Sequence, residues 1–182
     1  MSTRRTIERL VTCDEDTFHS DAPEFLSQHG LDPERVERAD EDLAALVEGL
    51  DAAAIAGLSA FERRLLRRLW VLDRGPLALT LAGPKYQDNP VIYVTQRFRD
   101  LTGYSLGDVR GENLRLLQGA DTEAAAVDAL REAVEIWEPV TVELWNYRAD
   151  GTRFRNRVSL VPCSDDTGTV TNWVGIQGRV DG

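Results

Sequence analysis

Three amide side chains in the C-terminal half form the clearest chemical pattern of this sequence. Asn146, Asn156 and Gln177 each fall in a stretch that alternates between apolar and polar residues, as a β-strand does when one of its faces is buried. A buried amide needs hydrogen-bond partners, because burying it unpaired costs free energy. Three amides on one apolar surface predict a flat ligand rich in carbonyl groups and ring nitrogens. In the alternative interpretation, the three amides bond one another or the backbone.

The strand alternation also sorts the neighbours of these amides onto two faces. The residues that share a face with an amide are Val140, Val142, Leu144, Val158, Leu160, Pro162, Trp173 and Gly175. The opposite, outer face carries Trp145, Tyr147, Val161, Val174 and Ile176. This outer face is too apolar to be left in water. We expect the helix at 59–73, a second copy of the chain, or both to cover it.

Other residue types that do chemistry are sparse. Cys13 and Cys163 lie far apart, and neither a CxxC motif nor a histidine cluster indicates a metal site. His19 and His29 are spaced too loosely to be a ligand pair on one helix, and we interpret both as surface residues. The sequence shows no catalytic dyad, so we expect a protein that is not an enzyme and holds no metal.

The elements that position the amides begin near residue 77. Stretches 77–81 and 91–95 predict two short strands, and 139–148, 153–163 and 170–180 predict three longer ones joined by hairpin turns. Between the two sets, short helices are expected at 96–102, 106–110, 113–118 and 122–136. This order predicts an α+β fold, a five-stranded antiparallel sheet with short helices on one face.

Residues 1–74 predict an acidic helical extension, and residues 75–182 the domain that carries the amides. Asp32 and Pro33 indicate a helix start, followed by one helix that contains Leu43, Leu46, Val47 and Leu50. A second helix begins at Ser59 with a capping box that Glu62 completes. The apolar stripe of this second helix is formed by Phe61, Leu65, Leu66, Leu69, Trp70 and Leu72.

Four arginines, Arg63, Arg64, Arg67 and Arg68, line the other side of that second helix. They are either a patch for nucleic acid or an acidic partner, or a solvated face balanced by the acidic segment at 32–51. We favour the solvated face.

The composition limits the function classes. The formal net charge is −10, and Lys85 is the only lysine among 21 basic residues. The negative charge argues against direct nucleic-acid binding, and the acidic, lysine-poor composition indicates a halophilic source, although a GC-rich genome would also favour arginine over lysine. The N-terminus lacks the apolar core of a secretory signal, and no apolar run is long enough to cross a membrane, so we expect a cytoplasmic protein.

A longer motif links these observations to a known family. The segment Gly111-Glu112-Asn113-Leu114-Arg115-Leu116-Leu117-Gln118-Gly119 resembles the signature G-x-N-C-R-F-L-Q-G of LOV domains, the blue-light-sensing, flavin-binding subclass of the PAS fold. The segments DNPVIYVTQRFRDLTGYS, WEPVTVELWNYRADGTRFRNRVSL and WVGIQ extend the resemblance from about residue 77 to 180. The sequence of these segments is similar to that of PAS/LOV modules of halophilic archaea, including relatives of bacterio-opsin activators.

The resemblance implies a flavin pocket, and FMN as its ligand, with FAD and riboflavin as alternatives. Asn146 and Asn156 would bond the pyrimidine edge of the flavin, and Gln177 would lie near its O4 and N5 atoms. Asn113 and Gln118 would hold the ribityl chain, and Arg115 and Arg131 the terminal phosphate. Further pocket residues implied by the resemblance are Thr80, Asn89, Leu114, Leu117, Val127, Leu130, Val134, Leu144, Val158, Leu160, Trp173 and Gly175.

One departure from the family affects the expected chemistry. The cysteine whose thiolate attacks the flavin in LOV domains aligns with Leu114, and an alkyl side chain is no nucleophile. Strand alternation places Cys163 on the outer face, and Cys13 lies outside the domain. We therefore expect a flavin-based sensor of blue light or redox state that works by flavin reduction without a cysteinyl adduct. The alternative is a PAS interaction module that binds flavin only for structure, or not at all.

The partners are also expectations. We predict a homodimer formed through the outer sheet face and the N-terminal helices, together with a downstream signalling protein that the sequence does not identify. We expect no membrane partner.

Overall fold

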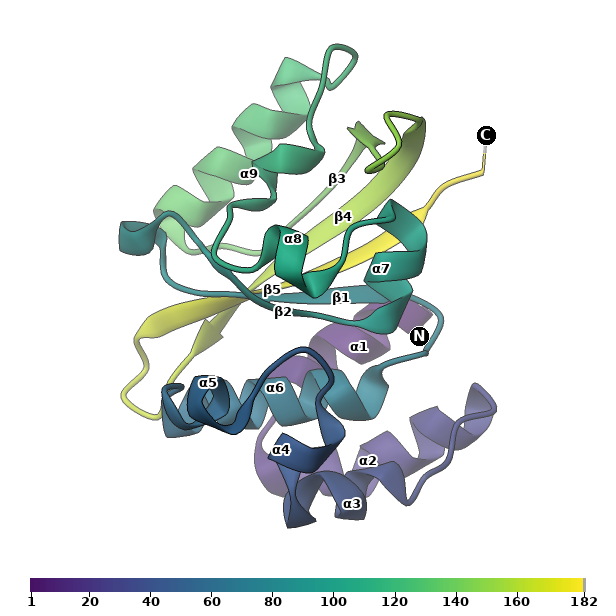
Figure 1. The fold of residues 1–182 in the computed structure, drawn as a ribbon, viewed down its shortest axis with the longest axis vertical. Coiled ribbons are helices and arrows are strands. Elements are labelled where there is room, and N and C mark those ends of the chain that lie inside the picture. The colour runs from purple at the N-terminus through teal and green to yellow at the C-terminus, as the bar shows by residue number, and fades with distance from the viewer. Residues whose placement is uncertain (182) are drawn as a thin grey trace. The chain divides into compact units, whose positions relative to one another are not determined.

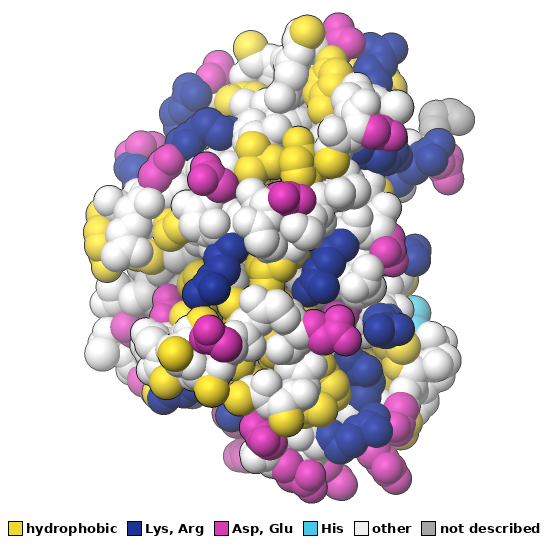
Figure 2. Space-filling view, viewed as in Figure 1, with side chains coloured by type: hydrophobic (Ala, Val, Ile, Leu, Met, Phe, Trp, Pro, Cys, Tyr) yellow, Lys and Arg dark blue, Asp and Glu magenta, His cyan; other side chains and the backbone are white. Residues whose placement is uncertain are grey.

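The computed structural model describes residues 1–181, and its chain divides into two compact units, Met1–Pro76 and Leu77–Gly182. Each unit has its own core of buried apolar side chains. The division lies two residues beyond the boundary predicted from the sequence. Among residues 1–181, no helix has both the length and the hydrophobicity that crossing a membrane requires. Dark blue basic side chains lie beside magenta acidic ones across the face drawn in Figure 2.

The first unit is helical throughout (Figure 1). Its elements are α1 (Thr3–Thr12), α2 (Glu15–Gln28), α3 (Arg35–Glu41), α4 (Leu43–Leu46), α5 (Ala52–Ala56) and α6 (Ala60–Leu72). The capping box predicted at the start of α6 is confirmed: Ser59 Oγ accepts from the Glu62 backbone N–H, and the Glu62 carboxylate accepts from that of Ser59. This reciprocal pairing satisfies two N–H groups that would otherwise lack a partner at the helix start.

The single helix predicted to start at Asp32 and Pro33 and to contain Leu43 through Leu50 is wrong, because α3 begins only at Arg35 and does not reach these leucines. The structure ends α3 at Glu41, and Asp42 leaves helical geometry with φ −150° and ψ 86°. The Asp42 carboxylate then caps the short helix α4 by accepting from the backbone N–H of Ala45. Aspartate favours such capping over a place inside a helix. Val47 and Leu50 are buried but lie outside any helix.

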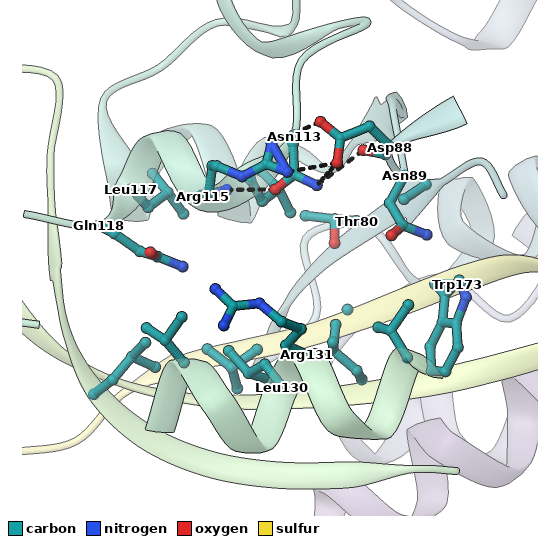
Figure 3. A pocket seen from close by; sticks show the side chains of 18 of the residues that line it. Thr80, Asp88, Asn89, Asn113, Arg115, Leu117, Gln118, Leu130, Arg131 and Trp173 are labelled. Atoms are coloured by element: carbon teal, nitrogen blue, oxygen red, sulfur yellow. Dashed lines mark hydrogen bonds and ion pairs between the residues drawn. The ribbon is translucent and has the colours of Figure 1, made fainter. Parts of the chain in front are cut away.

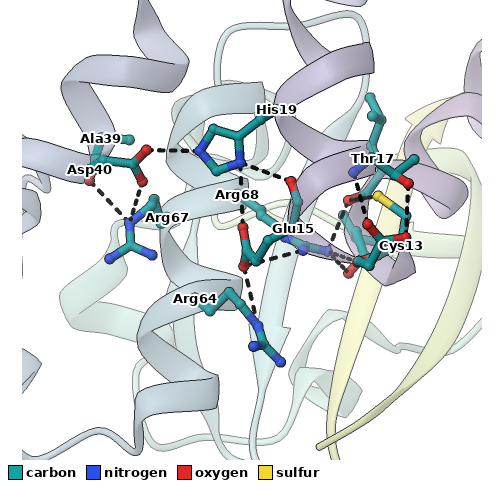
Figure 4. Close-up of polar contacts among 12 residues, drawn as sticks. Cys13, Glu15, Thr17, His19, Ala39, Asp40, Arg64, Arg67 and Arg68 are labelled. Carbon is teal, nitrogen blue, oxygen red and sulfur yellow. Dashed lines mark hydrogen bonds and ion pairs between the residues drawn. The ribbon is translucent and has the colours of Figure 1, made fainter. Parts of the chain in front are cut away.

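The four arginines of α6 do not form one solvated face. Arg68 is buried, and its Nη1 donates to the carbonyls of Leu10, Val11 and Cys13. It therefore satisfies carbonyl groups at the end of α1 that the helix itself leaves unpaired. Arg67 pairs with Asp40 of the acidic segment, as predicted, whereas Arg64 pairs with Glu15 of α2 (Figure 4).

The second unit is the predicted α+β fold. Its strands are β1 (Ala78–Ala82), β2 (Val91–Val94), β3 (Val140–Tyr147), β4 (Arg153–Ser164) and β5 (Val170–Arg179). They form one antiparallel sheet in the order β2-β1-β5-β4-β3, so the last strand lies at the centre. The connecting helices are η1 (Lys85–Gln87), α7 (Gln96–Thr102), α8 (Leu106–Val109), η2 (Leu114–Leu117) and α9 (Ala124–Ile136).

Helices α7, α8 and α9 lie on one face of this sheet (Figure 1). The predicted helix at 113–118 is shorter than expected, a single 3-10 turn that Asn113 caps. The capping interaction runs from the backbone N–H of Arg115 to Asn113 Oδ1, at 2.8 Å. This turn presents the central residues of the LOV-like motif to the helix-covered face of the sheet.

Candidate functional site: a cavity over the sheet

A cavity of about 440 Å³ lies in the second unit between the sheet and η1, η2 and α9 (Figure 3). This volume falls within the range of roughly 300–1,000 Å³ that is usual for small-molecule sites. All predicted pocket residues except Asn156 line it. They are Thr80, Asn89, Asn113, Leu114, Arg115, Leu117, Gln118, Val127, Leu130, Arg131, Val134, Leu144, Asn146, Val158, Leu160, Trp173, Gly175 and Gln177.

The three amides form a hydrogen-bonded row across neighbouring strands. Asn156 Nδ2 donates to Asn146 Oδ1 at 2.8 Å and to Gln177 Oε1 at 3.0 Å, and all three side chains are buried. Asn146 and Gln177 line the cavity, and Asn156 joins them from β4. The antiparallel register places these positions diagonally across adjacent strands, which lets the side chains meet.

The row is only partly satisfied by its own members. Asn146 Nδ2 donates to the Leu117 backbone carbonyl at 3.3 Å, which ties β3 to the end of η2. Within residues 1–181, the buried Oδ1 of Asn156 has no hydrogen-bond partner. The mutual bonding that the sequence left open as an alternative is therefore observed, but it leaves one buried acceptor unpaired. Because Asn156 does not itself line the cavity, this acceptor could meet a ligand N–H only if the amide row rearranged.

Strand β1 comes close to β5 on this face. Thr80 pairs with Gly175, and a Cβ atom built on Gly175 would lie 2.4 Å from Thr80 Oγ1. No side chain larger than hydrogen fits at residue 175 without displacing Thr80. Because Gly175 has no side chain, the floor of the cavity is open at this position, between Trp173 and Gln177 on the same face of β5.

Leu114 begins η2 and lines the cavity as a half-buried side chain. Cys163 of β4 is buried and is not among the residues that line the cavity. Cys13 belongs to the other unit. Neither cysteine therefore lines the cavity, and Leu114 presents a hydrocarbon side chain to it.

The two predicted phosphate ligands lie at an exposed end of the cavity, each in an ion pair. Arg115 forms a two-pronged pair with the carboxylate of Asp88, in which Nη1 donates to Oδ2 at 2.6 Å. Arg131 points from α9 into the cavity (Figure 3) and lies 3.2 Å from Asp128 of the same helix. The structure places both guanidinium groups around the same cavity.

Four further residues line the cavity that the sequence did not identify, namely Ala82, Lys85, Asp88 and Glu135. Ala82 shares the strand parity of Thr80, and Glu135 continues the helical stripe of Val127, Leu130, Arg131 and Val134. The 2- and 3.6-residue periods thus pointed to both. Lys85 and Asp88 lie in a turn, where no period applies.

The described residues 1–181 contain no group of three His, Cys, Asp or Glu side chains that could hold a metal ion. Neither cysteine forms a disulfide in this part of the chain. His19 bonds Asp40, and His29 Nδ1 lies 2.8 Å from the Phe25 carbonyl, so the two histidines belong to separate local contacts.

Comparison with known proteins identifies relatives of the second unit. A family model described as a PAS domain matches residues 78–177. The chain is 39% identical over 116 residues to the bacterioopsin transcriptional activator of Halobacterium salinarum, an alignment that covers 64% of this chain and 17% of that protein. It is 43% identical over 101 residues to blue-light-activated histidine kinase 1 of Erythrobacter litoralis, covering 56% of this chain and 28% of the kinase. The chain thus spans only a minor part of either relative.

Among solved structures, the LOV domain of a blue-light activated histidine kinase from Erythrobacter litoralis superposes with a TM-score of 0.56 at 39% identity. The match covers 60% of this chain and 100% of that domain. The resemblance drawn from the signature at 111–119 is confirmed. With its PAS match over more than half of its length and a LOV domain covered from end to end, this chain belongs to the PAS family, in the LOV subclass.

Proposed function

We propose that the second unit binds a flavin, FMN, in the cavity and acts as a sensor of blue light or redox state without forming a bond between flavin and protein sulfur. The observation that carries the proposal is the row of buried amides on a mostly apolar sheet face, in which Asn146 and Gln177 line the cavity and are joined by Asn156. The names of the relatives support it, since the histidine kinase is named as blue-light-activated.

In this proposal each polar residue has a stated task. Asn146 and Asn156 bond the pyrimidine edge of the ring, because an amide offers a donor and an acceptor side by side. Asn113 and Gln118 face the ribityl chain, and Arg115 and Arg131 hold the phosphate through their guanidinium groups. FMN is favoured over FAD because α9 begins at Ala124, shortly after the motif, so the connecting loop is short.

With Leu114 in place of a cysteine, the proposed chemistry is reduction of the flavin without a cysteinyl adduct. A bound flavin supplies visible absorption and reversible reduction, and no thiol from this chain lines the cavity to react with it. Protonation of the flavin N5 on reduction would turn an acceptor beside Gln177 into a donor. The Gln177 amide would then have to rotate, which would break the 3.0 Å hydrogen bond from Asn156. Because Gln177 lies in the central strand, between β1 and β4, the change reaches both neighbouring strands. We propose that this rearrangement reaches a second copy of the chain or another signalling protein through the outer sheet face.

The first test is the absorption spectrum of the purified protein. We expect a yellow protein with non-covalent FMN, and uptake of added FMN by any ligand-free fraction. A colourless protein that fails to take up FMN would overturn the proposal. Recovery of FAD in place of FMN would overturn only the choice of flavin.

The mutual bonding of the amides favours a second candidate, a PAS interaction module in which the row serves only to hold β3, β4 and β5 together. Illumination under anaerobic, reducing conditions separates the two. A sensor should change its oligomeric state or its protease sensitivity when the flavin is reduced. An interaction module should show no change in either.

A further inference from the structure

The exposed end of the cavity carries three cationic side chains and three carboxylates that pair with them. Lys85, Arg115 and Arg131 line it, and each forms an ion pair with a carboxylate of the same unit, namely Glu135, Asp88 and Asp128 respectively. A phosphate that enters meets cations whose charge is already balanced. The pairing of Arg115 is the most specific of the three, because both terminal nitrogens of its guanidinium contact one carboxylate.

Asp88 is held in place by its own backbone. It adopts a left-handed conformation with φ 67° at the end of η1, and its N–H donates to the Lys85 carbonyl at 2.8 Å. Asn113 Nδ2 donates to the Asp88 carbonyl, also at 2.8 Å. The backbone of Asp88 is therefore fixed beside η2 from two directions, and Asn113 Nδ2 also lies 3.4 Å from the Asp88 carboxylate on the side of Arg115 (Figure 3).

The contact between Asp88 and Arg115 is nevertheless exposed. The Arg115 side chain is 57% exposed and that of Asp88 64%. Exposed ion pairs contribute little free energy, so a phosphate can compete for the guanidinium. Whether the phosphate displaces Asp88 or binds a free edge of Arg115 beside it, two negative groups meet at one cation. Like charges at that distance repel, which opposes binding of the phosphate but not of the ring.

We propose that Asp88 is a specificity-determining residue of this cavity: it competes with the terminal phosphate of the ligand for Arg115, and so reduces the preference of the site for phosphorylated over non-phosphorylated flavins. The inference rests on the proposed flavin site. It adds that ring and phosphate are recognised by separate groups, the amide row and a guanidinium that an aspartate of the same chain already engages.

The test compares FMN with riboflavin on the full chain carrying Asp88→Asn. Asparagine has nearly the same shape and tolerates the left-handed conformation, so the turn should be preserved. We expect the Kd for FMN to fall about three- to tenfold, because an exposed pair and one repulsion are removed, while the Kd for riboflavin stays within about twofold. The gain should shrink at high salt, since exposed charges are screened.

Two further variants make the outcome specific. Glu132→Gln removes one negative charge from an exposed position on the helix that carries Arg131, and it should leave the ratio of the two affinities unchanged. In an Arg115→Gln background, Asp88→Asn should have a smaller effect on FMN, because the cation for which the two anions compete is gone. A change in thermal stability alone would not reproduce this pattern.

The outcomes separate the inference from the proposed function. If wild type binds neither flavin, the proposed function fails and the inference fails with it. If both flavins bind and Asp88→Asn leaves the ratio of their affinities unchanged, only the inference is overturned. An equal gain for FMN and riboflavin also overturns it, because Asp88 would then act on the cavity as a whole.

Discussion

The signature at 111–119 predicts that Leu114 takes the place of the reactive cysteine of LOV domains, and in the structure it lines the cavity. Replacing it by cysteine should give the flavin-loaded protein a strong loss of visible absorbance in blue light that recovers in the dark, because a nucleophile then faces the ring. The lost volume should lower the free energy of unfolding by about 1–3 kcal/mol. Absorption spectroscopy before, during and after illumination measures the first effect.

A matched control lies two residues further on. Leu116 belongs to the same η2 turn but does not line the cavity, so Leu116→Cys should show no reversible bleaching. If Leu114→Cys binds flavin as wild type does and does not bleach, Leu114 is not at the reactive position and the placement of the ring is wrong.

Asn156 has a different role, since it donates to both other amides and is itself buried. Asn156→Leu would leave the acceptors Asn146 Oδ1 and Gln177 Oε1 without these donors. We expect it to lower the free energy of unfolding by about 1–3 kcal/mol and to weaken flavin binding. Urea denaturation and a flavin titration measure the two effects separately. Unchanged flavin affinity would show that the row serves structure alone.

At this scale the sequence predicted which side chains gather around the cavity, but not how they bond. Strand parity alone placed Asn146, Asn156 and Gln177 together, because alternation survives any choice of rotamer. The partnership of Arg115 with Asp88 joins a 3-10 turn to a left-handed residue in another turn. Neither the turn geometry nor the rotamers can be derived from a repeating period.

At the level of elements, one histidine joins α2 to α3 by a hydrogen bond (Figure 4). His19 Nε2 lies 2.8 Å from Asp40 Oδ2, and His19 Nδ1 lies 2.8 Å from the Glu15 carbonyl. Only a doubly protonated ring donates to both acceptors. The hydrogen bond to Asp40, reinforced by that to the Glu15 carbonyl, raises the pKa of His19 above its ordinary value. Glu15 and Asp40 are in turn paired with arginines of α6.

A raised pKa in the folded state means that this stabilisation is complete below the unfolded value of about 6.5. It is lost as pH rises through the folded value. We predict that the stability of the full chain declines over this interval, as followed by thermal denaturation at a series of pH values. His19→Gln should remove the step, and His29→Gln should retain it. A step that persists in His19→Gln would assign it to another group.

Element bounds followed from local rules where those rules act alone. The capping box at Ser59 fixed the start of α6, and helix α7 begins and ends where the apolar period predicts. The rules failed at Asp42. The sequence around it predicted one continuous helix, but the Asp42 carboxylate caps a new helix, α4, and so separates it from α3. Arg68 was misjudged for a related reason: its burial depends on α1 carbonyl groups more than 50 residues away.

At the level of the whole molecule, the outer face of the sheet defines the next prediction. It carries Val161, Val174 and Ile176, and Arg153 and Arg155 stack over the ring of Trp145. We predict that deleting residues 1–74 makes the remaining domain aggregate or change its oligomeric state. Analytical ultracentrifugation of full-length and truncated protein measures this. A truncated domain that is monomeric, soluble and equally stable would contradict both the covering role and the dimer proposed for the N-terminal helices.

The register of the sheet has a consequence for which changes in chain length the protein tolerates. Strand β4 pairs with β3 from Arg153 to Leu160 and with β5 from Asn156 to Cys163, in both cases without irregularity. One inserted residue within that run would turn every following side chain to the other face and carry Leu160 out of the cavity. The turns at 149–151 and 165–168 can take a longer, flexible insertion, because the added residues loop out and leave the paired residues of both strands in place. Peptide tags or reporter domains should therefore be accepted in these turns and rejected one residue inside the strands.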